Sequence, residues 1–315
     1  MKKKNLNRFF GLAAMLLGSM LFLTSCYEEL EVVQTVNDEF SGVTKIEVES
    51  GFLEVNYQGN SNQTFLSLDG LLESSRSGNY RIEYEVIGNT LHVQLKQKGA
   101  FGGGRNRGYL NLNGPEDMEV TIESGSGMTR VSTVNSEILK VFAGSGSIEL
   151  NEVNSYKIHV EVGSGVIKGY DLNGNVIAKA GSGSMDFNRV IGDLEVFASS
   201  GNVEVSNLQG QLNSEMSSGR LQLENIDEVQ NLRISSGNIT GNRIGLGPKT
   251  LLSSSSGRIV LRTFSNLNDF NYDLQAGSGR VSVGENSSSG SLKINNGSTY
   301  TIHGSVSSGM IEINN

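Results

Sequence analysis

Hydrophobic and polar residues alternate along most of this chain, and the alternation is organised around a recurring Ser-Gly pair. Counting from each glycine, the second and fourth positions after it are mostly apolar, as are the third and fifth positions before it. Around Gly201, for example, Val203 and Val205 follow and Val196 and Ala198 precede. A period of two places these side chains on one face of a strand. Each unit is therefore predicted to be two short amphipathic strands joined at a Ser-Gly corner.

The spacing of the Ser-Gly pairs is nearly constant. Six successive steps from one pair to the next are about 18–19 residues long and the following two are slightly longer, which is a period typical of stacked supersecondary units that share one core. The serines of the pairs are Ser126, Ser145, Ser164, Ser182, Ser200, Ser218, Ser236, Ser256, Ser278 and Ser308.

Two architectures fit this pattern. In a single-stranded parallel β-helix, each rung lies about 4.8 Å above the last and the Ser-Gly corners form a column. In an antiparallel meander, each Ser-Gly would instead be the turn of a hairpin. The β-helix is favoured because a meander has no reason to keep its period constant. The signs of the charges at the third position after the glycine also alternate, as neighbours in a parallel stack require, at Arg130, Glu149, Lys168 and Asp186.

We therefore predict an all-β fold, a right-handed parallel β-helix with about 18–20 residues per rung and a strand-rich N-terminal cap. Between about residues 59 and 115 the period is lost, and strands are expected at 64–68, 80–86 and 90–95, the last two joined as a hairpin through Gly88 and Asn89. Residues 71–75 are predicted to form a short helical turn. The expected division is a signal peptide over 1–25, a tether over 26–38, an N-terminal β segment over 39–117 and repeats over 118–315, with one continuous domain over 39–315 as the alternative.

Composition and charge narrow the classes of partner. The 315 residues include 40 glycines, two prolines and no tryptophan, as expected for strands and tight turns. The formal charge is −8, and loss of the first 25 residues removes three lysines and one arginine, which leaves −8 − 4 = −12. Such an acidic surface argues against nucleic acid and against anionic lipid as partners. No cofactor is expected.

The start of the chain has the order of a secretory signal, with a basic segment, an apolar run from Phe9 to Leu23 and small residues before Cys26. At about 15 residues, the apolar run is short for a membrane span. The sequence from Leu23 to Cys26, Leu-Thr-Ser-Cys, resembles the lipobox of bacterial lipoproteins, which implies that Cys26 is lipidated and holds the protein on a membrane. A free cysteine beyond an ordinary signal is the alternative. The two glutamates that follow Tyr27 resemble the export signal of Bacteroidetes-type surface lipoproteins, so an outer-membrane location with exposure at the cell surface is expected.

The repeats also carry a resemblance to a family. The opening Phe-Ser-Gly-Val-Thr-Lys-Ile-Glu-Val at 40–48, the looser part near 91–95 and the run of Gly-Ser-Gly-Ser-Ile-Glu-Leu and Ser-Ser-Gly-Asn-Val-Glu-Val units look like the head GIN domain of auto-transporter adhesins. The resemblance covers about residues 40–315. It implies a single-stranded β-helix and an adhesin-like role at the cell surface, and it implies no catalytic residue.

Candidate contact residues are basic or aromatic. The segment 96–109 carries four basic residues among several glycines, so Arg105, Arg107 and Tyr109 are candidate contacts for phosphate or sulfated sugar, although a solvated loop is the plainer interpretation. Arg258 and Arg280 each follow a glycine of the repeat directly. We expect these two arginines side by side on the outer face of successive rungs.

No metal site and no catalytic residue are expected. The histidines His92, His159 and His303 are scattered without the spacing of metal ligands, and serine-rich turns offer poor ligands for calcium. We therefore expect a non-catalytic, lipid-anchored envelope protein that binds a glycan or a surface protein of the envelope or of a host. The alternative is a lyase or hydrolase acting on acidic or host glycans, because β-helices host such enzymes and use clustered carboxylates. Asp186 and Glu204 would lie side by side on successive rungs, where a solvated ladder of charges is the favoured interpretation.

Overall fold

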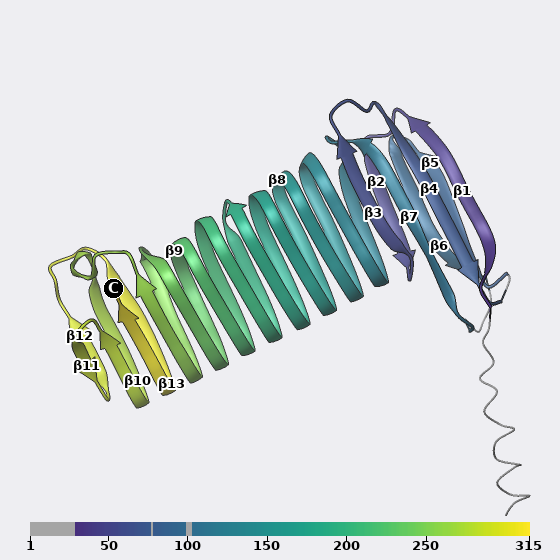
Figure 1. Ribbon diagram of the computed structural model, residues 1–315. Coiled ribbons are helices and arrows are strands. Elements are labelled where there is room, and N and C mark those ends of the chain that lie inside the picture. Colours follow the sequence, from purple (N-terminus) through teal and green to yellow (C-terminus); the bar gives the residue numbers. More distant parts are fainter. Residues whose placement is uncertain (1–28, 77, 99–102) are drawn as a thin grey trace, which may run out of the picture.

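The computed structural model describes residues 29–76, 78–98 and 103–315. These residues form an elongated stack of β rungs (Figure 1), and their thirteen strands belong to a single sheet. A 3-10 turn, η1 (Leu267–Asp269), is the only helical element of this part of the chain, which confirms the all-β expectation. The strands are β1 (Glu31–Ser41), β2 (Lys45–Gly51), β3 (Glu54–Asn60), β4 (Phe65–Ser74), β5 (Tyr80–Ile87), β6 (Thr90–Gln97), β7 (Asn106–Pro115), β8 (Glu119–Ile191), β9 (Leu194–Thr263), β10 (Asn271–Val283), β11 (Asn286–Ser288), β12 (Ser291–Ile294) and β13 (Thr301–Asn314).

β8 and β9 are each a continuous strand that winds through several rungs of the stack (Figure 1). β9 begins where β8 ends and pairs with it in parallel, with Val176 opposite Leu194 and Val190 opposite Leu208. Parallel pairing of consecutive rungs agrees with a stack of the β-helix type. It excludes the antiparallel meander for this part of the chain.

The Ser-Gly corners form the expected column, and the spacing of the rungs explains the glycine. Gly201 has φ of +127°, and a Cβ atom added to it would lie 1.7 Å from the carbonyl oxygen of Gly183 on the rung below. At Gly183, the same Cβ would lie 1.9 Å from the carbonyl oxygen of Gly165. Backbone of the neighbouring rung therefore occupies the place of a side chain, and only glycine fits.

A second corner lies six residues after each of these glycines, and its residues adopt the left-handed conformation although none is glycine. Their φ angles run from 54° to 59° over seven successive rungs. The Nδ2 atom of Asn225 donates a hydrogen bond to Oδ1 of Asn207 (2.9 Å), and the guanidinium of Arg189 binds the carboxylate of Asp171 (Nη2 to Oδ2, 2.6 Å). These side-chain contacts between rungs offset part of a conformational cost of about 1–2 kcal/mol per residue. The corner residues are Thr133, Glu152, Asp171, Arg189, Asn207, Asn225 and Arg243.

At the N-terminal end, the order of strands in space differs from their order in the sequence. β2 pairs in parallel with β8 on one side and with β6 on the other, and β3 lies in the same way between β8 and β7. β4 and β5 then add antiparallel to β7 and β6, and β1 adds antiparallel to β4. The predicted hairpin through Gly88 and Asn89 is confirmed. The predicted helical turn at 71–75 is wrong, because Leu72 is a buried residue of β4 that pairs with Gly108.

The other end of the stack contains a comparable insertion. β13 pairs in parallel with β9 through Ser308 opposite Ser256, and with β10 through Ser308 opposite Ser278. The last strand in the sequence is therefore an inner rung, and β10 lies beyond it with the short β11 and β12 at its side (Figure 1).

The core is one continuous column of aliphatic side chains that point inward from every rung. Val196, Val205, Leu232 and Ile234 are completely buried, as are most of their equivalents on other rungs. Burying one such side chain contributes about 1.5–3 kcal/mol, and each rung depends on its two neighbours for that burial. Ser214 occupies one of these inward positions and is also completely buried.

Candidate functional site

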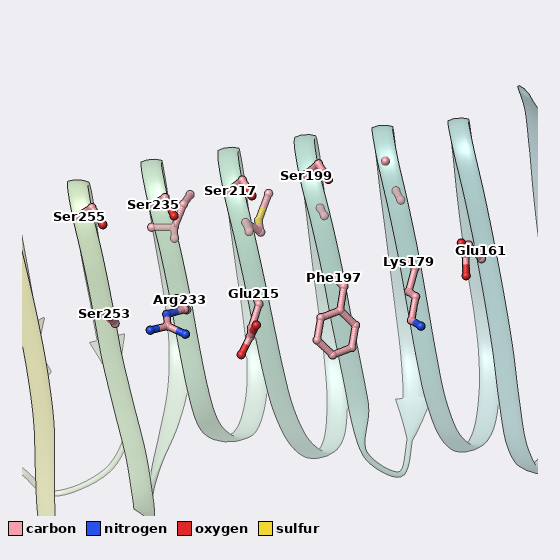
Figure 2. Close-up of a pocket in the computed structure, with 15 residues that line it drawn as sticks. Glu161, Lys179, Phe197, Ser199, Glu215, Ser217, Arg233, Ser235, Ser253 and Ser255 are labelled. Atoms are coloured by element: carbon pink, nitrogen blue, oxygen red, sulfur yellow. The ribbon is translucent and has the colours of Figure 1, made fainter. Parts of the chain in front are cut away.

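Two surfaces of the rod flank the column of Ser-Gly corners. The first, called here the serine face, consists of the outward residues that precede each Ser-Gly corner. A shallow groove of about 610 Å³ crosses it. Figure 2 shows that Glu161, Lys179, Phe197, Glu215 and Arg233 project from successive rungs in one row along this groove. Serines line the groove nearer the corner, namely Ser199, Ser217, Ser235 and Ser255.

The carboxylates in the row on the serine face lie far apart. Glu161 and Glu215 are separated by three rungs, which is about 14 Å at the usual strand spacing. Pairs of carboxylates that act together on a glycosidic bond lie about 5–9.5 Å apart. The row therefore offers alternating charges around Phe197 to an extended partner, and it lacks the geometry of this acid and base pair.

His159 lies beside this row, on the outer face as the alternation predicts, but its ring is half-covered. It packs edge-on against Phe142, with ring centroids 5.1 Å apart and an interplanar angle of 83°. Burial lowers the pKa of His159, and the nearby charge of Lys179 acts in the same direction. The imidazole is therefore held in its neutral form more strongly than a solvated histidine would be.

The second surface, called here the arginine face, consists of the outward residues that follow each Ser-Gly corner. Its first rungs carry the predicted ladder of alternating charges, with Arg130 Nε 4.0 Å from Glu149 Oε2. Asp186 and Glu204 pair across successive rungs as expected. The hydroxyl of Tyr170 donates to Asp186 Oδ2 at 3.0 Å, and burial and this hydrogen bond raise the pKa of the tyrosine.

No group of three or more His, Cys, Asp or Glu side chains in the described part of the chain could hold a metal ion. Among the residues that the structure describes, no third His, Cys, Asp or Glu side chain joins Asp186 and Glu204 in a group that could hold a metal ion. Such a pair fits a charge ladder on a solvated sheet better than a cation site, since calcium takes six to eight oxygen ligands.

The expectation that Arg258 and Arg280 lie on successive rungs is wrong. Met310 of β13 pairs with Arg258 on one side and with Arg280 on the other, so a rung separates the two arginines. The physical reason is the insertion of β13 between β9 and β10. Arg258 has its Nη2 atom 4.0 Å from Glu312 Oε2, and its side chain is 57 % exposed.

The three other candidate contact residues lie at the N-terminal end of the rod, away from these arginines. Arg107 and Tyr109 belong to β7, and the guanidinium of Arg107 binds the carboxylate of Glu73 (Nη2 to Oε1, 3.2 Å). This hydrogen bond lowers the pKa of Glu73. The backbone N–H of Arg105 donates to the Ser75 hydroxyl at 3.0 Å. β7 thus places Arg107 and Tyr109 in the sheet and commits the Arg107 guanidinium to a partner within the protein.

The predicted signal peptide and the lipidation site Cys26 lie outside the described residues. Within the described residues, no helix has the length and apolar character needed to cross a bilayer. The row on the serine face is a feature that the sequence analysis misses. Counting four residues before each glycine of the repeat would have found it, because that position holds Glu161, Lys179, Phe197 and Glu215 in turn.

A comparison with protein-family models gives a match over most of the chain. A family model described as Toastrack DUF4097 matches residues 43–314. A search of curated proteins found no match. These results do not single out the GIN domain.

Several solved structures are similar at low identity. A protein from Bacteroides fragilis NCTC 9343, provisionally described as an adhesin, is 14% identical, with 89% of this chain and 97% of that chain covered and a TM-score of 0.37. A provisionally assigned cell adhesion protein from Clostridium sporogenes ATCC 15579 has the same identity, coverages of 89% and 99% and a TM-score of 0.28. A provisionally assigned lipid binding protein from Parabacteroides distasonis ATCC 8503 also has 14% identity, with coverages of 89% and 96% and a TM-score of 0.29. At these scores the likenesses carry no argument about function.

Proposed function

The chain belongs to the Toastrack DUF4097 family, and from this premise we propose that it is an adhesin-like binding or scaffolding rod of the cell envelope, without catalytic activity. The observation that carries the proposal is the arrangement of the outward side chains. Each rung contributes one residue to each row, about 4.8 Å from the next, and the charges in the serine-face row alternate. Such a surface suits an extended partner that lies along the rod, such as a glycan or a protein of the envelope or of a host.

The same proposal places the protein on the outer membrane, held by a lipid on Cys26 and exposed at the cell surface. The Leu-Thr-Ser-Cys sequence that ends at Cys26 supports this anchor. We also propose that the chain is a member of the head GIN group. Its rungs would wind in a right-handed sense, with the period of the Ser-Gly pairs. A Cys26→Ala variant is expected to leave the membrane fraction, and a variant that still sediments with membranes would count against lipidation.

A glycan array probed with the purified protein, with and without calcium, tests the binding role. We expect binding to extended polysaccharides that does not depend on calcium. If the protein binds no glycan and cross-links to no envelope or host protein on intact cells, the binding role is wrong. Release of shortened sugar products during the incubation would contradict the proposed absence of catalysis.

A second candidate function rests on Asp186 and Glu204. Their rung spacing of about 4.8 Å is close to the separation of about 5–5.5 Å between the two carboxyl groups of retaining glycosidases. A polysaccharide hydrolase of this kind would release reducing ends from acidic polysaccharides. The activity would be lost in Asp186→Asn, and Glu195→Gln on the serine face is the matched control.

A further inference from the structure

Three arginines stand on one line of the arginine face, at the position directly after the Ser-Gly glycine. Along the rod the order at this position is Arg220, Asn238, Arg258, Met310 and Arg280, since the glycines before them stack and Met310 pairs with both of its neighbours. An arginine therefore occurs on every second rung. The three arginine side chains are exposed, and successive arginines are about 9.6 Å apart at the usual strand spacing.

The face is hollowed between the first two of these arginines. A depression of about 410 Å³ is lined by Arg220 and Gln222 on one rung, Asn238 and Thr240 on the next, and Arg258 and Val260 on the third. The amides and the hydroxyl can exchange hydrogen bonds with sugar hydroxyls, and Val260 offers an apolar contact to a sugar ring. None of the described residues that line the depression is acidic.

The guanidinium groups along this line retain donors for a ligand. Arg258 meets Glu312 only at 4.0 Å. In the part of the chain that the structure describes, neither Arg220 nor Arg280 has a carboxylate oxygen within 4.0 Å of its guanidinium. A guanidinium can bind a carboxylate through two parallel hydrogen bonds, which makes arginine suited to a ligand whose carboxylates are regularly spaced.

We propose that this arginine row binds an acidic polysaccharide with one carboxylate per disaccharide, lying along the rod axis. The proposal rests on the proposed binding role and names the ligand class for it. A disaccharide of an extended pyranose chain is about as long as two rungs, about 9.6 Å, so its carboxylates repeat in step with the arginines. Acidic side chains on one face of an extended peptide repeat every second residue, at a spacing of about 6.8 Å. The phosphate charges of one nucleic-acid strand repeat at about 3.4 Å. The charge spacing of an acidic peptide and that of a nucleic acid therefore both differ from the spacing of the arginines.

Hyaluronan oligosaccharides test the match, because they alternate a glucuronate with a neutral sugar. Binding is measured by calorimetry with the full-length protein in detergent at low salt. We expect the tetrasaccharide to bind through Arg220 and Arg258, and the hexasaccharide to bind more tightly through the additional contact with Arg280. Arg258→Gln should weaken tetrasaccharide binding about tenfold, as for loss of a hydrogen-bonded charge pair. Arg280→Gln should abolish the gain from tetrasaccharide to hexasaccharide while leaving the tetrasaccharide affinity unchanged.

Arg81→Gln provides the matched control, since it removes the same charge from an exposed position on β5, away from both rows. Equal weakening by Arg81→Gln and Arg258→Gln would show general attraction to a polyanion and would overturn the inference. Equal binding of a neutral chitin oligosaccharide would also overturn it. If no hyaluronan oligosaccharide binds while the array still reports other glycans, the inference fails and the proposed binding role stands. Equal denaturation midpoints for the variants confirm that they are folded.

Discussion

Replacing Gly201 with alanine tests whether the glycine column sets the spacing of the rungs. The added Cβ would lie 1.7 Å from the Gly183 carbonyl oxygen, whereas an ordinary contact begins near 3.4 Å. The oxygen is a backbone atom and the position of the Cβ is fixed by the backbone of residue 201, so no side-chain rotation can make room. One rung must separate from the next, or the corner must change its conformation.

The cost of Gly201→Ala can be worked from two contributions. Holding a residue with a Cβ at φ of +127° costs about 1–3 kcal/mol. Steric overlap in a packed region adds about 1–3 kcal/mol. We therefore expect the free energy of unfolding to fall by about 2–6 kcal/mol, which is a large share of the total of about 5–15 kcal/mol that typically holds a domain together. Because each rung contacts only its neighbours, the loss should be centred on this part of the stack.

Urea denaturation followed by far-UV circular dichroism measures this effect. Gly290→Ala is the matched control, because no atom lies within 4 Å of the Cβ that would be added and the glycine does not have a left-handed φ. The control should stay within about 0.5 kcal/mol of the wild type. A Gly201→Ala variant that loses less than about 1 kcal/mol would refute the argument that backbone contact dictates the glycine.

Three further predictions concern other parts of the rod. Ser214→Ala should raise the free energy of unfolding by about 1 kcal/mol in the same urea assay, because the buried Ser214 hydroxyl has no hydrogen-bond partner among the described residues. Deleting residues 301–315 should increase amide hydrogen exchange in 251–262 and 271–283, which lose a neighbouring strand, and unchanged exchange there would contradict the pairing. Burial lowers the pKa of His159, so the unfolded state binds more protons between that lowered value and about 6.5. The free energy of unfolding should therefore fall on acidification through this window. In the His159→Gln variant, the plot of denaturation midpoint against pH should be flatter over the same window.

The repeat could be predicted from the sequence because two local signals agree. Alternation around Gly201 marks two strands, and the constant step marks a stack. The left-handed corner could not be predicted in the same way, because Thr133 and Glu152 are poor indicators of positive φ, and Asn207 and Asn225 are too few to define a column. Residues 71–74 belong to β4 and do not form the predicted helical turn, because tertiary pairing with β7 decides their conformation.

The order of the rungs at the two ends lies beyond any local pattern. Ser308 follows the repeat rule as well as Ser278 does, and nothing in either unit tells which one contacts β9. For the same reason, the sequence places Arg258 and Arg280 one rung too close together. The neighbours Asp186 and Glu204 could be placed correctly, since they lie where spatial order follows the sequence. The ion pair between Arg107 and Glu73 depends on the antiparallel pairing of β4 with β7, which the period does not encode.

The inserted position of β13 has a consequence for the order in which the rod is assembled. The gap between β9 and β10 can be filled only after residues 301–314 have been synthesised. Until then, β9 and β10 each lack the strand that pairs with them in this region. The insertion of β13 between them is therefore a late event. Afterwards, β13 is held by a neighbour on each side, so unravelling that begins at residue 314 would have to pull β13 out from between two strands and could not simply peel away an outer one.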